Sequence, residues 1–390
     1  MEMDVCDLLR RMLGVESVNR HISGRAAPEA DLVDLLEREA AALGLATRRL
    51  AVAGEADDLL VTAPTIVDGA PWLLFESHTD TVGVEGMIVP PFRATDTPGR
   101  IHGRGACDTK ASGAAMLVAL AEHARSLAAG EPGVNGALLF TVDEEIARAG
   151  IHRLMDTHLP ALGWRPAAAI SGEPTRLRMV VAHNGVVRGV IRTRGVAAHS
   201  SNPRLGRSAI SAMLPIIREL EEVVFPGITA SHPLTGAAVG SVNVFRGGEQ
   251  VNIIPAAAEI HVDRRVVPGE DGHAVEAGLL ALLDRFRAAD PDLHVEYTDP
   301  IVHGTLDPAT NGAWAAIVGA TLARLGLDPD GIGVAYGTDA SEFSDAGIPA
   351  VVFGPGDIAQ AHAADEWVEI DQLERAVTIY RELLRGPLPD

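Results

Sequence analysis

Cysteine is scarce in this sequence of 390 residues, which contains only Cys6 and Cys107. Two cysteines are too few for a disulfide framework, and they cannot supply a zinc site built from thiolates. Any metal ion that the chain binds must therefore be held by histidine and carboxylate side chains.

Basic residues are also few, because 32 lysines and arginines stand against 53 aspartates and glutamates, and the formal charge is −21. A polyanion such as nucleic acid binds to a basic surface, so this charge disfavours nucleic-acid partners. No run of like charges stands out, and we interpret the acidity as that of a solvated surface.

Long uncharged apolar stretches are missing from the sequence, so we predict no membrane-spanning segment. The first twenty residues, MEMDVCDLLRRMLGVESVNR, carry charges throughout and are typical of an amphipathic helix rather than a secretory signal. We therefore expect a cytoplasmic protein. Because a chain of this length usually exceeds what one hydrophobic core can fill, we also expect two domains.

Helical patterns alternate with short apolar runs in the first part of the chain. Helices are predicted over 28–43 and 110–128, and strands over 72–77, 137–142 and 167–172. This alternation predicts an α/β fold with a parallel or mixed sheet flanked by helices. Ligands of such sheets gather at the carboxyl ends of the strands.

The pattern changes between residues 180 and 299, where the predicted order βαββαβ describes a complete small α+β domain. Its strands are expected over 186–195, 238–247, 256–265 and 293–298, and its helices over 207–224 and 270–288.

The remaining residues return to the first pattern, with helices over 310–325 and 371–385 and a strand over 349–354. We therefore predict that one domain consists of residues 1–179 and 300–390, with a second domain of residues 180–299 inserted into it.

The segment SHTDTV places His78 at a predicted strand end and Asp80 two residues later. An imidazole at this position can bind a metal while the aspartate orients it. A single histidine is more often structural, so this signal is weak alone.

Asp108 lies in the segment GRGACDTK, between a glycine-rich turn and the helix predicted from Lys110. A carboxylate has two oxygens and can bridge two metal ions, one on each oxygen. The alternative is that Asp108 only caps the helix that follows it, and for this residue alone capping is favoured.

Glu144 and Glu145 stand side by side in TVDEEIA, directly after a predicted buried strand. Buried charge is costly unless it meets a cation, and successive residues point in different directions. One glutamate can therefore bind a metal while the other accepts a proton from a water molecule that the metal activates.

Two further candidates follow strands: Glu173 in SGEPT and His362 in QAHAADE. With the earlier candidates they give each of two ions one histidine, one glutamate and a share of the same aspartate. Oxygen and imidazole ligands suit zinc, with cobalt or manganese as alternatives. The five predicted metal ligands are His78, Asp108, Glu145, Glu173 and His362.

The sequence closely resembles the zinc aminoacylase and carboxypeptidase family that contains acetylornithine deacetylase, succinyl-diaminopimelate desuccinylase, aminoacylase and glutamate carboxypeptidase. The resemblance covers nearly the whole chain and follows the segments SHTDTV, GRGACDTK, DEE, SGEPT, AHSSNP, NIIP and QAHAADE in order. It is strongest to acetylornithine deacetylase and its relatives. It implies a catalytic domain like that of zinc exopeptidases and an inserted lid and dimerisation domain.

For the metal centre, the resemblance implies that His78 and Glu173 bind one ion, that Glu145 and His362 bind the other, and that Asp108 bridges them. Glu144 would be the general base, Asp80 would orient His78, and the peptide bond from Asp108 to Thr109 would be cis.

For the inserted domain, the resemblance implies a homodimer in which His199 of AHSSNP reaches across to polarise the scissile carbonyl. Asn252 of NIIP would contact substrate, and Arg265 of HVDRR would hold a substrate carboxylate through paired hydrogen bonds.

The sequence therefore predicts a hydrolase that cleaves the amide bond of an N-acyl amino acid, for example N-acetylornithine. Desuccinylation and dipeptide or carboxypeptidase cleavage at the same centre remain open, since similarity fixes a reaction better than a substrate. A third hypothesis is a catalytically silent metal-binding protein, against which the presence of Glu144 and His199 argues.

Overall fold

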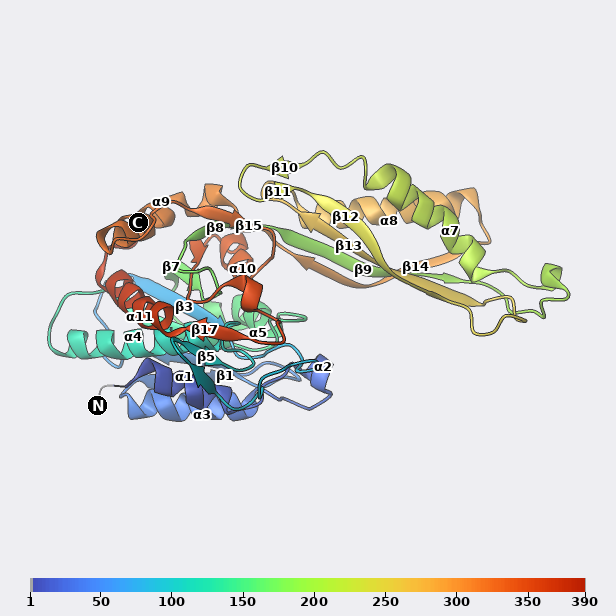
Figure 1. Ribbon diagram of the computed structural model, residues 1–390. Helices are drawn as coiled ribbons and strands as arrows, with labels where there is room; N and C mark the ends of the chain where they lie inside the picture. Colours follow the sequence, from blue (N-terminus) through green and yellow to red (C-terminus); the bar gives the residue numbers. More distant parts are fainter. Residues whose placement is uncertain (1–2, 390) are drawn as a thin grey trace. The chain divides into compact units, whose positions relative to one another are not determined.

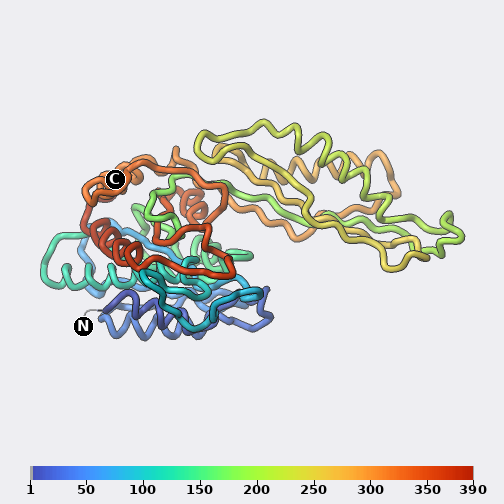
Figure 2. Tube along the Cα trace, in the orientation of Figure 1, coloured from blue at the N-terminus to red at the C-terminus, as the bar shows by residue number. Residues whose placement is uncertain are grey.

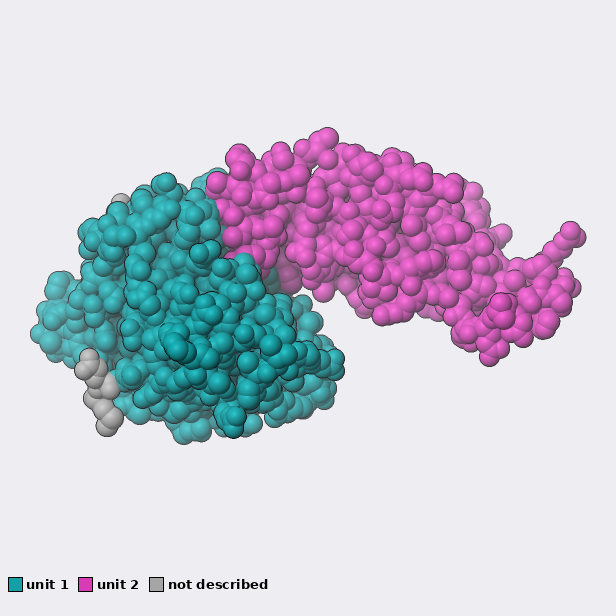
Figure 3. Space-filling view, viewed as in Figure 1, with its two compact units in different colours: residues 1–181, 308–332, 338–390 teal, residues 182–307, 333–337 magenta. Residues whose placement is uncertain are grey.

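The computed structural model describes residues 3–389 and separates into two compact units. The first unit comprises residues 1–181, 308–332 and 338–390. The second comprises residues 182–307 and 333–337, and Figure 3 colours the two units separately. Within the described residues, no helix is long and apolar enough to cross a membrane.

The first unit is built on an eight-stranded mixed sheet with the strand order β1-β2-β6-β3-β7-β16-β8-β15 (Figure 1). Its central strands are β6 (Asn135–Thr141), β3 (Trp72–His78), β7 (Pro166–Ser171) and β16 (Ala350–Val352). These four strands are parallel to their neighbours within the set. The outer strands are β1 (Ala46–Leu50), β2 (Asp58–Thr62), β8 (Val180–His183) and β15 (Ile332–Val334).

The central strands are almost continuously apolar because both faces of a parallel sheet are covered by other elements. All seven residues of β6 are buried. The α/β fold with a mixed sheet, predicted from the alternation of strands and helices, is confirmed.

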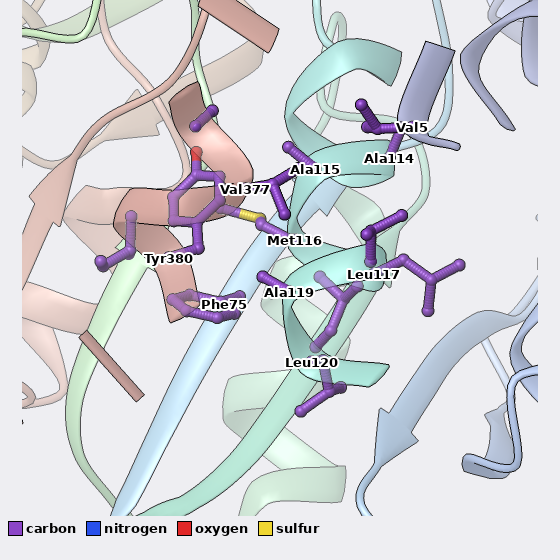
Figure 4. Close-up of a cluster of buried hydrophobic side chains, with 14 of the residues drawn as sticks. Val5, Phe75, Ala114, Ala115, Met116, Leu117, Ala119, Leu120, Val377 and Tyr380 are labelled. Carbon is purple, nitrogen blue, oxygen red and sulfur yellow. The ribbon is translucent and has the colours of Figure 1, made fainter. Parts of the chain in front are cut away.

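Helices of the first unit share one apolar core with the sheet, and Figure 4 shows part of it. The helices in this core are α1 (Val5–Leu13), α3 (Ala30–Ala42), α4 (Lys110–Ala128), α9 (Pro308–Arg324) and α11 (Ile370–Arg385). Figure 4 shows Phe75 of β3 and Tyr380 of α11 beside Met116 of α4. The Tyr380 hydroxyl donates to the Phe353 carbonyl at 2.7 Å, so this buried polar group has a partner.

Helix α4 lies close to the sheet because its inner side carries small residues. A Cβ atom at Gly113 would lie 2.7 Å from Cε1 of Phe140 and 3.0 Å from Oγ of Ser77. Any side chain here would therefore push the helix away from β3 and β6. The close approach places the start of α4 near the carboxyl ends of the strands.

The remaining elements of the first unit are short. A three-stranded sheet has the order β17-β5-β4. Its members are β4 (Thr95–Thr97), β5 (Arg100–His102) and β17 (Trp367–Glu369). The short helical elements are α2 (Arg20–Ser23), α5 (Ala149–Arg153), a π-helical turn (Leu154–His158), α6 (Leu159–Ala161), α10 (Ala340–Asp345) and a 3-10 turn (Ile358–Gln360).

The second unit contains the βαββαβ order predicted for this region. Its elements are β9 (Gly185–Arg194), α7 (Ala209–Glu219), β12 (Val239–Gly247), β13 (Ala257–Val266), α8 (Gly272–Ala289) and β14 (His294–His303). The strands form an antiparallel sheet with the order β12-β13-β9-β14. Burial alternates along β13, as expected for a sheet with one face on a core, and α7 and α8 supply that core.

Short elements complete the second unit: a 3-10 turn (Pro203–Leu205), a π-helical turn (Leu220–Val224) and the small strands β10 (Ser231–His232) and β11 (Gly236–Ala237). Figure 2 shows that the chain forms this unit in its green to orange part and then returns to the first unit.

The predicted element boundaries need three corrections. The first helix is shorter than expected, because Asp4 caps it and it ends before Gly14. The helix predicted over 207–224 begins at Ala209, where Ser208 accepts a hydrogen bond from the Ser211 N–H, and it ends in the π-helical turn. The last strand of the inserted order continues past a bulge to His303.

Candidate metal centre

The carboxyl ends of four neighbouring strands carry four of the five predicted metal ligands. His78 is the last residue of β3, Glu145 follows β6, Glu173 follows β7 and His362 follows β16 and its 3-10 turn. Because these strands are parallel and adjacent, their following loops meet at one edge of the sheet. Asp108 reaches the same place from the loop before α4.

One group of possible metal ligands consists of His78, Asp108 and Glu173, all buried. Nε2 of His78 lies 3.0 Å from Oδ1 of Asp108 and 3.8 Å from Oε1 of Glu173. A second group consists of Asp108, Glu145 and His362. Nε2 of His362 lies 3.2 Å from Oδ2 of Asp108 and 3.2 Å from Oε1 of Glu145.

These separations match the size of a metal coordination shell. Zinc bonds to nitrogen and oxygen of about 2.1 Å place neighbouring tetrahedral ligands about 3.4 Å apart. The two groups use different oxygens of the Asp108 carboxylate. His78 contacts one oxygen and His362 contacts the other. The donor set therefore fits two cations bridged by Asp108.

The competing role for Asp108, that of a helix cap, finds no support in the geometry. The residue in the N-cap position of α4 is Thr109, and no side chain makes a capping hydrogen bond there. Both carboxylate oxygens of Asp108 face histidines instead. The peptide bond between Asp108 and Thr109 is cis, as the resemblance implies.

The electrostatics of this edge also favour cations. Burial and the nearby Asp108 charge raise the pKa of Glu145 to about 7, and the same two causes raise the pKa of Glu173 well above its usual value. Hydrogen bonds to Asp108 and Glu145 raise the pKa of His362 to about 10. Several carboxylates are thus packed together with too little positive charge, and divalent ions would balance them.

Asp80 contacts His78 and also the loop that carries Glu144 and Glu145. Its backbone carbonyl lies 3.0 Å from Nδ1 of His78, and its Oδ1 lies 3.4 Å from the same nitrogen. Its two carboxylate oxygens also accept hydrogen bonds from the backbone N–H groups of Glu144 and Glu145 at 3.0 and 3.1 Å. This buried aspartate therefore holds both a candidate ligand and the loop that carries the candidate base.

Glu144 contacts Arg148, whose role was not predicted from the sequence. Nη2 of Arg148 lies 3.3 Å from Oε1 of Glu144, and Nε of Arg148 lies 3.5 Å from Oδ1 of Asp339. Burial raises the pKa of Glu144, while the Arg148 charge opposes that rise. The only sequence signal was the spacing of four residues between a glutamate and an arginine, which is common on protein surfaces.

Residues from distant segments of the sequence contact the loop that carries Asp108 and the start of α4. Oε1 of Glu366 accepts hydrogen bonds from the N–H groups of Cys107 and Asp108 at 2.9 and 3.1 Å. Its Oε2 lies 2.5 Å from Nη1 of Arg104, and both side chains are almost fully buried. Lys110 begins α4, and its buried Nζ donates to backbone carbonyls of Met12 and Val15 at 3.2 and 2.9 Å.

The Arg104 and Glu366 pair leads to a prediction about stability. Glu366→Gln removes the partner charge of a buried guanidinium, which we expect to cost about 3–5 kcal/mol of unfolding free energy. Urea denaturation followed by circular dichroism measures this loss.

The matched control is Glu131→Gln, which breaks an exposed 3.2 Å pair with Arg385 and should cost less than about 1 kcal/mol. Equal effects of the two substitutions would contradict the role given to Glu366.

The second unit contains the other three predicted site residues. His199 is exposed, with its Nδ1 2.7 Å from Oγ of Ser201, and a β-bridge joins it to Ile253. Asn252 is next to this bridge and is also exposed. Arg265 lies on β13, where its Nε donates to Oδ1 of Asp263 at 2.8 Å. His199 and Asn252 are thus brought together, whereas Arg265 is engaged by a neighbouring carboxylate.

Known proteins similar to this chain include carboxypeptidases and deacylases by name. A protein named "Probable carboxypeptidase" from Aspergillus clavatus is 30% identical over 408 residues, covering 97% of this chain and 81% of that protein. Acetylornithine deacetylase of Myxococcus xanthus is 29% identical, and 90% of each chain is covered.

The fold is shared with the M20 family metallo-carboxypeptidase Sso-CP2 of Sulfolobus solfataricus, with a TM-score of 0.75 at 20% identity over 98% of this chain and 99% of that one. The model of peptidase family M20/M25/M40 matches residues 74–386. The chain therefore belongs to peptidase family M20/M25/M40, a family of metal-dependent hydrolases.

Proposed function

We propose that this protein hydrolyses the amide bond of an N-acyl amino acid, as an acetylornithine deacetylase does. The observation that carries the proposal is the pair of ligand groups that share Asp108, with the carboxylate of Glu144 on the neighbouring loop. Dinuclear metal binding is typical of the family. We propose zinc as the metal, with cobalt or manganese as alternatives, because the donors are imidazole and carboxylate groups.

When bound, two divalent ions would lower the pKa of water and polarise the carbonyl of the substrate. His78, Glu173, Glu145 and His362 would hold them, with Asp108 shared. Hydrogen bonds from the backbone N–H groups of Asp108 and Glu145 to Glu366 and Asp80 hold two of the loops that carry these residues, so little reorganisation is needed when substrate arrives.

Glu144 would perform the proton transfers. Its carboxylate accepts a proton from the attacking water as the new C–O bond forms, and returns it to the nitrogen as the C–N bond breaks. Arg148 holds the Glu144 side chain through the 3.3 Å contact, and Asp80 holds its backbone N–H. The products are a carboxylic acid and a free amino acid.

The substrate class rests on relatives rather than on the metal ligands. Acetylornithine deacetylase of Myxococcus xanthus and the fungal "Probable carboxypeptidase" have nearly equal identity to this chain. Carboxypeptidase or dipeptidase cleavage is therefore the second candidate, and desuccinylation is a third. All three cleave an amide bond beside an amino acid, so the same base and ligands would serve each of them.

The roles of the second unit belong to the same proposal. We propose that it acts as a lid and dimerisation domain, with the partner subunit's His199 polarising the carbonyl, Asn252 contacting substrate and Arg265 binding a carboxylate. Sedimentation of the active enzyme tests this, because a fully active monomer would contradict a role for His199 across an interface.

A release assay distinguishes the candidate substrates. The zinc-loaded or cobalt-loaded enzyme is mixed with matched N-acetyl, N-succinyl and dipeptide substrates of the same amino acids, and the free amine is measured. We expect the highest kcat/KM for an N-acetyl amino acid. A preference for dipeptides would replace the deacylase assignment with a peptidase one, and no hydrolysis of any substrate would support the catalytically silent alternative.

A further inference from the structure

A second cluster of possible metal ligands lies in the first unit, apart from the five residues described above. It consists of His21, Glu55 and Asp143, and their ligand atoms all lie within 4.8 Å of one another. His21 comes from α2, Glu55 from the loop between β1 and β2, and Asp143 from the loop after β6. Three separate segments thus converge on one point.

The side chains in this cluster are only partly paired. Nε2 of His21 lies 4.0 Å from Oδ1 of Asp143, which is too far for a hydrogen bond. The side chain of Glu55 is 5% exposed, and its Oε1 pairs with Nη1 of Arg20 at 2.9 Å. Oε2 of Glu55 is buried and has no hydrogen-bond partner among the described residues.

A fourth carboxylate, that of the buried Glu29, interacts electrostatically with two members of this cluster, Glu55 and Asp143. Glu29 is 0% exposed, and neither of its carboxylate oxygens has a hydrogen-bond partner in the described part of the chain. It precedes α3 in the N-cap position but makes no side-chain cap. Burial, followed by the charges of Asp80, Glu55 and Asp143, raises the pKa of Glu29 to about 8, so these carboxylates act on it together.

The charges of this cluster favour the binding of a cation. Glu29, Glu55 and Asp143 bring three carboxylates, against which Arg20 and a half-exposed His21 stand. Burying a carboxylate without a partner is costly, and the usual compensation is a proton, an ion pair or a metal. Arg20 pairs with one oxygen of Glu55 and leaves the buried oxygens of Glu29 and Glu55 unmatched.

We propose that His21, Glu55 and Asp143, with Glu29 beside them, form a third divalent cation site, distinct from the pair that shares Asp108. One imidazole with several carboxylate oxygens suits Mn²⁺ or Zn²⁺ better than a cation that takes oxygen ligands alone. The site stands on its own geometry and does not depend on which amide the enzyme cleaves.

This third site is connected to the candidate catalytic loop by one side chain. Nδ2 of Asn19 donates to Oδ1 of Asp143 and to Oδ2 of Asp80, both at 2.8 Å. Asp80 in turn holds the N–H groups of Glu144 and Glu145. A cation on Asp143 therefore stabilises the start of the loop that carries the candidate base, and acts as a positioning element rather than a catalytic one.

Metal stoichiometry tests the proposal without reference to activity. The purified protein is stripped with chelator, dialysed against Mn²⁺, desalted and analysed by inductively coupled plasma mass spectrometry. We expect about three Mn²⁺ per chain for the unchanged protein and about two for Glu55→Gln. The matched control is Glu16→Gln, an exposed glutamate that pairs with Arg25 at 3.3 Å, and it should keep three.

His21→Gln provides an independent variant, because the His21 side chain is 44% exposed and its replacement is expected to leave the core intact. It should also bind two ions, with the Mn²⁺-dependent rise in melting temperature reduced at concentrations that saturate the other two sites. Two ions in the unchanged protein, or three in both variants, would overturn the proposal. An enzyme that hydrolyses no tested amide but binds three ions would leave this site standing while removing the proposed function.

Discussion

Glu144→Gln is expected to lower kcat by roughly 10²–10⁴-fold while the enzyme keeps its metal ions. Glutamine has the shape of glutamate but cannot accept the proton from water at neutral pH. The backbone N–H of Glu144 still donates to Asp80, so the loop keeps its position. Steady-state kinetics with an N-acyl amino acid, together with metal analysis of the same sample, measures both quantities.

The adjacent residue supplies the comparison for this experiment. Glu145→Gln removes a carboxylate that lies 3.2 Å from His362, so it should weaken binding of one ion as well as turnover. Glu144→Gln should change turnover alone. A near-normal rate for Glu144→Gln, or loss of metal from it equal to that from Glu145→Gln, would refute its assignment as the base.

Asp108→Asn is expected to remove activity and to weaken the binding of both ions together. An asparagine offers one oxygen where the carboxylate offers two, and it removes the negative charge shared by the two ligand groups. Loss of a residue that only supports a metal ligand typically costs 10–100-fold in affinity, and loss of the bridge should cost more than about 100-fold. Titration of the metal-free protein with Zn²⁺ measures the change.

The helix-cap hypothesis makes a different prediction for the same variant. Loss of a cap would lower the unfolding free energy by about 1 kcal/mol and leave metal binding intact. Asp108 makes no capping hydrogen bond, and its charge raises the pKa values of buried Glu145 and Glu173. Contacts with His362 and His78 hold the pKa of Asp108 below its usual value, so metal-free Asp108→Asn should also lose some stability, and metal affinity is the measurement that separates the two roles. Normal metal affinity with reduced stability would restore the capping role.

The parts of the fold that could be predicted are those with long and regular patterns. Helix α4 begins and ends where its pattern predicts, because small and apolar residues fill most of it between Lys110 and Ala128 and it contains no proline. Strands β3, β6 and β7 were predicted to within two residues because apolar runs of their length are bounded by polar residues. Strand β1 was missed, since its sequence ATRRL is charged and largely exposed.

The candidate metal ligands could be proposed from the sequence, whereas the residues that hold them in position could not. His78, Glu145, Glu173 and His362 each follow an apolar strand, which is a local signal, and the resemblance then divided them between two ions. Three supporting residues, Asn19, Arg148 and Glu366, have no such signal, because their roles arise only from contacts with distant segments. Glu366, for example, holds the N–H of a residue 258 positions earlier.

Lys110 is the only lysine in the sequence, and its amine is buried against two backbone carbonyls. Burial lowers its pKa to about 7, which favours the uncharged amine as long as it stays in this buried position. Amine-directed reagents therefore have no lysine to modify on the folded surface. Acylation of Lys110, followed by mass spectrometry, would instead report the rate at which the contact between α1 and the start of α4 opens.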